Sequence, residues 1–331
     1  MRVLVTGSAG FIGFHIARRL LDRGDTVLGV DNFTTYYDVA LKEARNALLA
    51  DAPGFTLARV SIEDADAFGA AWSAFKPEVV IHLAAQAGVR YSIDAPRSYV
   101  GANIVGTHNV LELARAHGVR HLLAASTSSV YGANRDIPFT EEQRTQLPMS
   151  LYAATKGATE LLGHSYSHLF GIPATFFRFF TVYGPWGRPD MALFKFTRAI
   201  LADQPIDVYN HGRMARDFTF IDDLVEAVVR LIDVVPGSEP VPGDSLSPVA
   251  PFRQVNIGAG RPVPLMDYIA ALEAALGREA TKNYLPMQPG DVPTTEASSA
   301  LLEALTGYVP ATNAREGVAR FVQWYRGHYG V

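Results

Sequence analysis

Short apolar segments alternate with longer helical patterns through the first 180 residues of this 331-residue chain, and this alternation limits the possible folds more than any other feature. The expected strands are 2–6, 26–31, 55–60, 79–83, 119–126 and 174–179. The expected helices are 11–23, 39–50, 64–75, 99–117 and 151–170. Several strands are apolar almost throughout, which is typical of strands covered on both faces. The pattern predicts an α/β fold with a doubly wound parallel sheet.

The regular alternation ends after residue 180. A loop rich in glycine and proline follows at 184–189. Further helices are expected at 191–202, 222–235, 264–276 and 314–328, with one more strand at 254–257. We therefore predict two domains. Residues 1–180 form a nucleotide-binding domain, to which 217–258 returns in part, and residues 181–216 and 259–331 form a smaller, discontinuous C-terminal substrate domain.

Composition excludes several classes of protein. Hydrophobic residues make up 48% and charged residues 19% of the chain, a balance that excludes disorder. A net charge of −4 offers no basic surface to nucleic acid or anionic membranes. The lack of cysteine excludes disulfides, thiolate zinc sites and cysteine nucleophiles. With neither a leader pattern nor an apolar run of about 20 residues, we expect a cytoplasmic protein with no membrane or nucleic-acid partner.

A glycine-rich turn follows the first expected strand and opens a helix. Gly7, Gly10 and Gly13 are spaced by three, so the backbone can turn tightly and approach a pyrophosphate at the helix N-terminus. Asp31 ends the second strand, where a carboxylate can accept hydrogen bonds from the adenosine ribose hydroxyls and would repel a 2′-phosphate. The pair of features predicts NAD rather than NADP as the cofactor.

Tyr152 and Lys156 stand four residues apart, so they are neighbours on one face of the fifth helix. A free tyrosine has a pKa of about 10 and is a poor base at neutral pH. A nearby ammonium and the positive nicotinamide ring of NAD both favour the phenolate, so we expect a lowered pKa and a role in proton transfer.

Hydroxyl side chains occupy residues 126–129, at the carboxyl end of the fifth expected strand. Ligands of open α/β sheets bind at that edge. A hydroxyl there can bridge a sugar oxygen and Tyr152 and pass a proton. The same run would also suit an ordinary turn or helix cap, and the residues alone leave both interpretations open.

With these residues placed, the sequence resembles the extended short-chain dehydrogenase/reductases, whose nucleotide domain is Rossmann-like, and among them the nucleotide-sugar 4-epimerases. The resemblance covers essentially the whole chain. Its general motifs are Thr-Gly-x-x-Gly-x-x-Gly at 6–13, His-Leu-Ala-Ala at 82–85, Ser-Val-Tyr-Gly at 129–132, Tyr-x-x-x-Lys at 152–156 and Arg-Asp-Phe at 216–218. Segments 85–92, 183–192 and 287–292 resemble, more narrowly, the subgroup that acts on UDP-glucuronate.

This resemblance implies a redox-neutral isomerase that keeps NAD bound. Tyr152 would remove the proton of the sugar 4-hydroxyl while hydride moves from C4 to nicotinamide, and the 4-keto sugar would then turn and take the hydride back on its other face. Thr127 would relay the proton, and Lys156 would hold the nicotinamide ribose. The cofactor residues that it implies are Gly7, Gly10, Phe11, Ile12, Gly13, Asp31, Asn32, Ile62, Leu83, Ala84, Ala85, Tyr152 and Lys156.

The resemblance also implies a UDP-sugar site. By motif position, Arg216 would bind the diphosphate and Asp291 the uridine ribose. Two positions depart from common relatives: Gln288 replaces an arginine of the glucose/galactose epimerases, and Ser61 replaces an acidic residue that holds adenine. The substrate residues that it implies are Arg90, Thr127, Ser128, Ser129, Thr181, Arg188, Arg216, Gln288 and Asp291.

The two residues after Thr127 separate branches of this family. Related dehydratases usually carry Asp-Glu there, and related UDP-glucuronate decarboxylases usually carry glutamate two residues after the threonine. In this chain both positions are serine, Ser128 and Ser129. Neutral hydroxyls can hydrogen-bond a carboxylate but are not strong general acids. The resemblance therefore favours interconversion of UDP-glucuronate and UDP-galacturonate.

A sugar carboxylate needs a cation or several hydrogen-bond donors. Arg188 is the leading candidate, with Thr181 and the two serines assisting, and Arg90 is a weaker one. For either arginine the alternative is a solvated surface charge.

Other functions stay open. The first is a UDP-glucose/UDP-galactose 4-epimerase, the second a non-catalytic NAD-binding sensor that would not need Tyr152 or Lys156, and the third a net oxidoreductase that would consume added NAD. Glu160, His164 and His168 repeat at i+4, but successive steps drift by about 40° around a helix, so we expect no metal site. By analogy with the family we expect a homodimer formed by the helices near 99–117 and 151–170.

Overall fold

Seven parallel strands form the central sheet of the computed structural model, which describes residues 1–237, 239–288 and 290–331. Pro289, within the 287–292 motif, lies outside these residues. The strand order β3-β2-β1-β4-β5-β6-β10 reverses direction between β1 and β4, so the crevice at the carboxyl ends of these two strands is the expected ligand site. The strands are β1 (Arg2–Thr6), β2 (Thr26–Val30), β3 (Phe55–Ala58), β4 (Val79–His82), β5 (His121–Thr127), β6 (Ala174–Phe179) and β10 (Phe252–Ile257).

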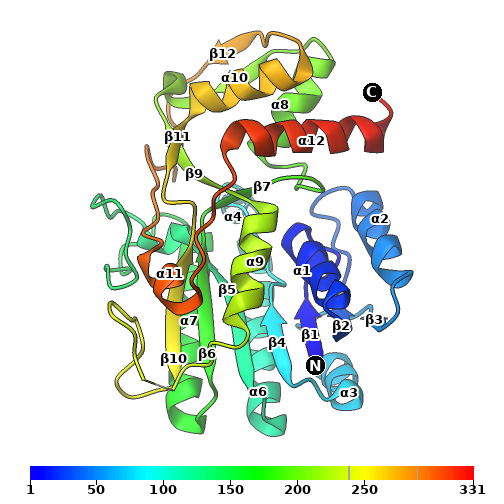
Figure 1. Ribbon diagram of the computed structural model, residues 1–331, viewed down its shortest axis with the longest axis vertical. Coiled ribbons are helices and arrows are strands. Elements are labelled where there is room, and N and C mark those ends of the chain that lie inside the picture. Colours follow the sequence, from blue (N-terminus) through cyan, green and yellow to red (C-terminus); the bar gives the residue numbers. More distant parts are fainter. Residues whose placement is uncertain (238, 289) are drawn as a thin grey trace.

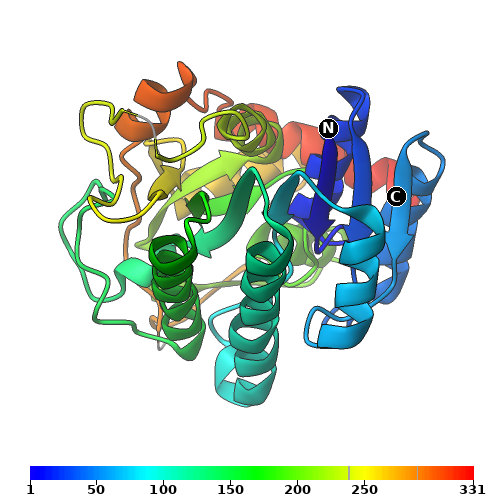
Figure 2. The ribbon, with the colours of Figure 1, turned by 90° about the horizontal axis from the view of Figure 1, so that it is seen from below.

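Helices cover both faces of the sheet (Figures 1 and 2). One face carries α1 (Phe11–Asp22), α2 (Val39–Ala50), α9 (Ile221–Leu231) and α11 (Ala300–Thr306). The other carries α3 (Ala65–Phe75), α6 (Gly106–His117) and α7 (Leu151–Phe170), which lie side by side in Figure 2. The predicted α/β, doubly wound parallel sheet is therefore confirmed.

A second layer lies beyond the carboxyl ends of the central strands, at the top of Figure 1. It contains two small sheets, with the orders β11-β9-β7 and β12-β8. Its elements are β7 (Thr181–Tyr183), α8 (Ala192–Leu201), β8 (Ile206–Val208), β9 (Ala215–Phe220), β11 (Pro262–Pro264), α10 (Leu265–Leu276), β12 (Lys282–Tyr284) and α12 (Ala314–Tyr329). The predicted domain division stays a prediction, and α11, which falls in the range 259–331, packs on α9 and β10 of the large sheet.

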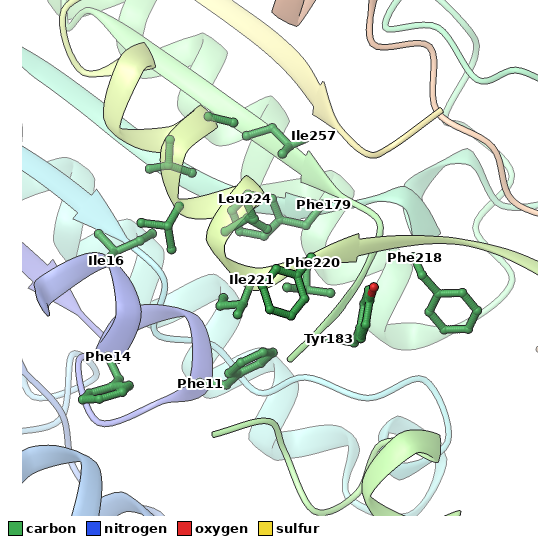
Figure 3. Close-up of a cluster of buried hydrophobic side chains, with 14 of the residues drawn as sticks. Phe11, Phe14, Ile16, Phe179, Tyr183, Phe218, Phe220, Ile221, Leu224 and Ile257 are labelled. Atoms are coloured by element: carbon green, nitrogen blue, oxygen red, sulfur yellow. The ribbon is translucent and has the colours of Figure 1, made fainter. Parts of the chain in front are cut away.

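One hydrophobic cluster joins the two layers (Figure 3). Phe11 and Phe14 of α1 lie in the same cluster as Ile221 of α9 and Tyr183 and Phe218 of the second layer. Full burial of a large apolar side chain contributes about 1.5–3 kcal/mol, so this cluster holds the glycine turn before α1 rigidly against the second layer.

The expected helix 99–117 is helical in the structure but is not one regular α-helix. A π-helical turn (Val100–Val105) leads into α6, and two short helices, α4 (Tyr91–Asp94) and α5 (Pro96–Tyr99), precede it. The turn directs Asn103 inward, where its amide nitrogen donates to the Gln86 carbonyl (3.1 Å) and to the Thr155 hydroxyl (3.0 Å). A π-turn inserts one residue into the helical register, and apolar periodicity does not reveal it.

Two fully buried histidines make the protein sensitive to acid. Burial lowers the pKa of His82 on β4 to about 3 and that of His121 on β5 to about 4. The unfolded chain takes up protons on these groups near pH 6.5 while the native protein does not, so stability falls as the pH falls. We expect the free energy of unfolding, measured by urea titration, to drop between pH 6.5 and 5 by up to about 1.4 kcal/mol per histidine and pH unit. Imidazole NMR signals assigned to His82 and His121 that titrate near pH 6.5 in the native protein would contradict this.

Among the described residues, no helix combines the length and the apolar character that crossing a bilayer requires.

Candidate functional site

The glycine turn lies against the end of β4 at the sheet's switch point. Gly7 has a φ of +73°, and a Cβ there would lie 2.9 Å from the Ala84 nitrogen. A Cβ on Gly13 would collide with the Gly7 carbonyl oxygen, so only glycine fits this turn. No side chain caps the first turn of α1. The N–H groups of Gly7, Ala9 and Gly10 are bonded within the chain, whereas the first N–H groups of α1 have no side-chain cap, which suits a pyrophosphate.

The Thr6 hydroxyl ties this turn to the end of β4. It accepts the backbone N–H groups of Leu83 (3.0 Å) and Ala84 (3.1 Å). The structure therefore brings two groups of predicted cofactor residues, 7–13 and 83–85, together at one edge.

The residues predicted to hold the adenosine gather where β2 and β3 end. Asp31 is 8% exposed, and its carboxylate accepts the N–H groups of Ala9 (3.0 Å) and Phe33 (2.8 Å). Asn32 donates to the Ser61 hydroxyl at 3.3 Å, and Ile62 is buried beside it. Asp31 therefore links the glycine turn to the position expected for the ribose.

The three predicted catalytic residues meet between β5 and α7. Ser150 caps α7 by accepting the Ala153 N–H (3.1 Å), which places Tyr152 in the first turn. Lys156 lies one turn further along, 3% exposed. Thr127 ends β5, where its hydroxyl accepts the Ser129 N–H at 3.2 Å and lies close enough to hydrogen-bond the Tyr152 phenol. Ser128 and Ser129 follow it, half-buried.

The expectation of a lowered pKa for Tyr152 is wrong for the chain alone. Burial raises the pKa of the phenol, and hydrogen bonding to Thr127 and the charge of Arg188 oppose this only in part. Burial also lowers the pKa of Lys156 to about 8, against the attraction of Glu160. Among the described residues the Lys156 ammonium has no hydrogen-bond partner, and a buried cation of this kind fits the ribose hydroxyls of NAD.

A buried ion pair fixes α7 to the sheet below these residues. Glu160 of α7 receives two hydrogen bonds from Arg178 of β6, at 3.0 and 2.8 Å, and a third from Ser126 of β5 at 2.5 Å. Because a buried pair of this geometry tolerates little displacement, it holds Tyr152 and Lys156 in a constant position relative to Thr127.

Arg188, the predicted carboxylate anchor, lies in the loop after β7, close enough for its charge to act on Tyr152. It lines one cavity together with Thr181. Its guanidinium forms a two-point ion pair with Asp190, at 2.9 and 2.5 Å, and Asp190 also accepts the Tyr36 hydroxyl at 3.0 Å. Sequence reasoning did not identify Asp190 or Tyr36 as partners, although Asp190 stands within the 183–192 motif.

The residues predicted to bind the uridine diphosphate gather in the second layer. Arg90, predicted as the weaker candidate for the sugar carboxylate, lies beside them, where it pairs with Asp291 at 3.2 Å and lies over the Tyr209 ring. Arg216 of β9 donates to the Pro293 carbonyl at 3.0 Å and is attracted by Asp291. The main-chain carbonyl of Gln288 accepts the Asp291 N–H at 3.3 Å. Two cations that share one carboxylate suit a diphosphate beside a ribose.

The histidine stripe on α7 is engaged elsewhere. His164 contacts the Ser247 hydroxyl at 2.8 Å, and His168 the Val249 carbonyl at 2.7 Å. Within residues 1–237, 239–288 and 290–331, no cluster of three or more metal-ligating side chains occurs.

Sequence reasoning also missed Arg45. It is fully buried on α2 and contacts both the glycine turn and the loop that carries Arg188. The available signal was a lysine and an arginine, Lys42 and Arg45, within the apolar stripe Leu41–Leu49 of an amphipathic helix.

Known proteins share this sequence and fold. The sequence model described as the NAD dependent epimerase/dehydratase family matches residues 3–241. A probable UDP-glucuronate 4-epimerase of Rhizobium meliloti (strain 1021) is 58% identical over 99% of this chain and 98% of its own.

Two solved structures share the fold. A UDP-glucuronic acid 4-epimerase of Bacillus cereus in complex with UDP-glucuronic acid and NAD superposes with a TM-score of 0.90 at 32% identity, over 99% of this chain and 100% of that one. A UDP-glucose 4-epimerase of Thermotoga maritima with UDP-glucose has a TM-score of 0.87 at 28% identity, with the same coverage. From its sequence and its fold, the chain belongs to the NAD-dependent epimerase/dehydratase family.

Proposed function

We propose that this protein is an NAD-dependent 4-epimerase that interconverts UDP-glucuronate and UDP-galacturonate. The observation that carries the proposal is the arrangement around Tyr152. Thr127, at the end of β5, lies beside its phenol, and the neutral Ser128 and Ser129 follow in the next turn. The charge of Arg188, in the loop after β7, also acts on this phenol. The similarity to proteins named UDP-glucuronate 4-epimerases supports the same substrate.

The residues of this chain would divide the work as follows. When bound, NAD supplies reversible hydride chemistry at C4 of the sugar. Tyr152 takes the proton of the 4-hydroxyl, with Thr127 as the relay, and returns it after the sugar has turned. Lys156 holds the cofactor ribose, and its charge favours the phenolate.

The carboxylate must survive the reaction. Once C4 is a ketone, the carboxylate is β to it, and such acids lose carbon dioxide when the breaking C–C bond aligns with the carbonyl π system. Ser128 and Ser129 can donate hydrogen bonds to the carboxylate without delivering the strong acid or base that elimination needs. We propose that they and Arg188 hold it out of that alignment.

One observation favours a neutral sugar instead. Arg188 already holds a carboxylate of its own chain, that of Asp190, so a uronate must displace or share this partner. Incubation with UDP-glucuronate and with UDP-glucose separately, with products identified by NMR, decides between the two. Formation of UDP-galactose at a rate equal to or above that of UDP-galacturonate would contradict the uronate assignment.

We expect the purified protein to carry NAD, and added NADP not to replace it. The reason is that the Asp31 carboxylate is fixed by two backbone N–H groups and would repel the 2′-phosphate of NADP. Chromatography of the nucleotide released on denaturation measures this. The matched variant Asp31→Asn should retain less NAD and accept NADP better, and an unchanged preference would contradict the role of Asp31.

We propose a homodimer formed through α6, α7 and the π-helical turn. Leu161 (75%) and Leu169 (64%) on α7 are exposed, as are Val100 (47%) and Val105 (44%) in the π-helical turn, which packs against α7. Light scattering should give the mass of two chains, and Leu161→Glu should give one. The cytoplasmic location and the lack of a nucleic-acid partner stay predictions from the sequence.

A further inference from the structure

Arg45 joins two segments that are far apart in the sequence. Its side chain is fully buried, and its guanidinium donates to the carbonyl of Ala9 in the glycine turn (3.0 Å). It also donates to the carbonyls of Trp186 (2.6 Å) and Gly187 (3.3 Å) in the loop that carries Arg188. A guanidinium has five donors in a fixed plane, so it can hold both segments at a set distance, which a lysine cannot do.

Arg45 is not held there by an acidic partner. In the part of the chain that the structure describes, it has no ion pair, and its remaining contact is the Tyr37 hydroxyl at 2.8 Å. Placing a cation in the interior without a carboxylate is costly unless its donors are used. Both Nη atoms of Arg45 are used, whereas its Nε is buried without a partner among the described residues. All of its main-chain acceptors lie in the glycine turn or in the loop that carries Arg188. This indicates that the role of Arg45 is to hold these two segments together.

The loop has further contacts of the same kind. His15 of α1, one turn after the glycine turn, contacts the Pro185 carbonyl at 3.0 Å, and burial lowers the pKa of His15 to about 4, so the neutral ring donates. Three consecutive carbonyls, 185–187, are thus bound by side chains from α1 and α2. The Trp186 ring packs between Phe14 and the α12 residues Trp324 and His328. Figure 1 shows the end of α12 above α2.

We propose that Arg45 is a positioning residue that keeps Arg188 in register with the cofactor turn and so protects the substrate carboxylate from loss. The proposal rests on the proposed function. The glycine turn sets where the cofactor lies, Arg188 sets where the carboxylate lies, and Arg45 sets the distance between them without touching the substrate. A displacement of about 1 Å in such a frame can change a rate by about 100-fold.

The side reaction to be measured is a decarboxylation. In the 4-keto uronate the C5–C6 bond breaks, its electron pair passes to C5 and the 4-carbonyl as an enolate, C6 leaves as carbon dioxide, and C5 takes a proton. The oxidising equivalent is the NAD already used to form the ketone, so each event leaves a UDP-4-keto-pentose and one reduced NAD.

The test compares Arg45→Met, Arg45→Lys and Leu49→Ala with the wild-type holoenzyme. Leu49 is 1% exposed, one turn along the same helix, so its variant controls for lost stability. With UDP-glucuronate, Arg45→Met should raise the ratio of 4-keto-pentose to epimer by about tenfold, Arg45→Lys by less, and Leu49→Ala not at all. Hydrogen exchange of residues 184–191, read by mass spectrometry without substrate, should rise in Arg45→Met and not in Leu49→Ala.

The outcomes separate the alternatives. If hydrogen exchange at 184–191 is unchanged in Arg45→Met, Arg45 does not hold the loop and the proposal fails. If exchange is faster but the product ratio is unchanged, Arg45 is purely structural and the proposal fails as well. An equal rise in Leu49→Ala would also overturn the proposal. If Arg45→Met does not fold, His15→Phe, which removes only the Pro185 contact, takes its place in both measurements. If the wild-type protein does not convert UDP-glucuronate, the proposed function fails. The hydrogen-exchange result alone then decides whether Arg45 holds the loop 184–191 against the glycine turn.

Discussion

Replacing Tyr152 with phenylalanine is expected to lower turnover of UDP-glucuronate by about 10²–10⁴-fold, the usual contribution of a positioned acid–base group. The ring would keep its place in the first turn of α7, so UDP-sugar binding should be retained. The expected loss is large because phenylalanine has no hydroxyl with which to exchange a proton with Thr127. The other side chain that Thr127 hydrogen-bonds among the described residues, Ser129, is a neutral hydroxyl and a poor base. Initial rates and calorimetric binding measure the two effects.

Tyr166→Phe is the matched control for this variant. Tyr166 lies on the same helix, and its hydroxyl bonds Glu112 at 2.6 Å, away from Thr127 and Lys156. We expect its turnover to be close to that of the wild type. A Tyr152→Phe enzyme within about threefold of the wild type would mean that Tyr152 is not the base.

Replacing Arg188 with alanine is expected to weaken UDP-glucuronate binding by about 2–3 kcal/mol, as for a hydrogen bond to a charged group. UDP-glucose, which has no carboxylate, should be affected much less. The turnover that remains should release more 4-keto-pentose and reduced NAD, because the carboxylate is no longer held. Parallel kinetics on both sugars, with the by-product quantified by mass spectrometry, give all three quantities.

Two further variants make this result specific. Arg188→Ala alone leaves the Asp190 carboxylate without its cation, and this charge could itself repel the substrate. The double variant Arg188→Ala, Asp190→Ala removes that carboxylate, and it should still bind UDP-glucuronate poorly. Arg90→Ala, which breaks the pair with Asp291 on the nucleotide side, should weaken both sugars equally. Equal losses on both sugars for Arg188→Ala, with no extra by-product, would leave Arg188 as a structural residue and favour the neutral-sugar function.

The sequence predicts the large sheet well and the second layer poorly, for a physical reason. Most central strands are covered on both faces and are therefore largely apolar, and their predicted ends differ from the structure by at most two residues. Strand β9 instead reads Ala-Arg-Asp-Phe-Thr-Phe and contains Asp217, which is fully buried. Its carboxylate is satisfied by the N–H groups of Ala259, Gly260 and Ala297, from segments that no local pattern connects to it.

The same distinction holds for the site. Glycine spacing and the Tyr152–Lys156 pair are local, so they could be predicted from neighbouring residues. The contact of Tyr36 with Asp190, the partner of Arg188, could not, because Tyr36 comes from the segment after β2 and meets Asp190 only in the folded chain. For the chain without NAD, the pKa of Tyr152 is raised and not lowered, because burial, which the sequence does not quantify, outweighs the Thr127 hydrogen bond and the Arg188 charge.

The position of β10 has a consequence for how the chain is synthesised. This strand pairs with β6 along its whole length, yet residues 180–251 must be made before it. Until then, the emerging chain presents β6 as an unpaired, apolar edge, a template for pairing with other nascent chains. Arg253, 1% exposed and bound to Asp244 at two points, then locks the arriving strand in place. A ribosomal stall or a truncation before residue 252 should therefore yield aggregates rather than a smaller folded unit.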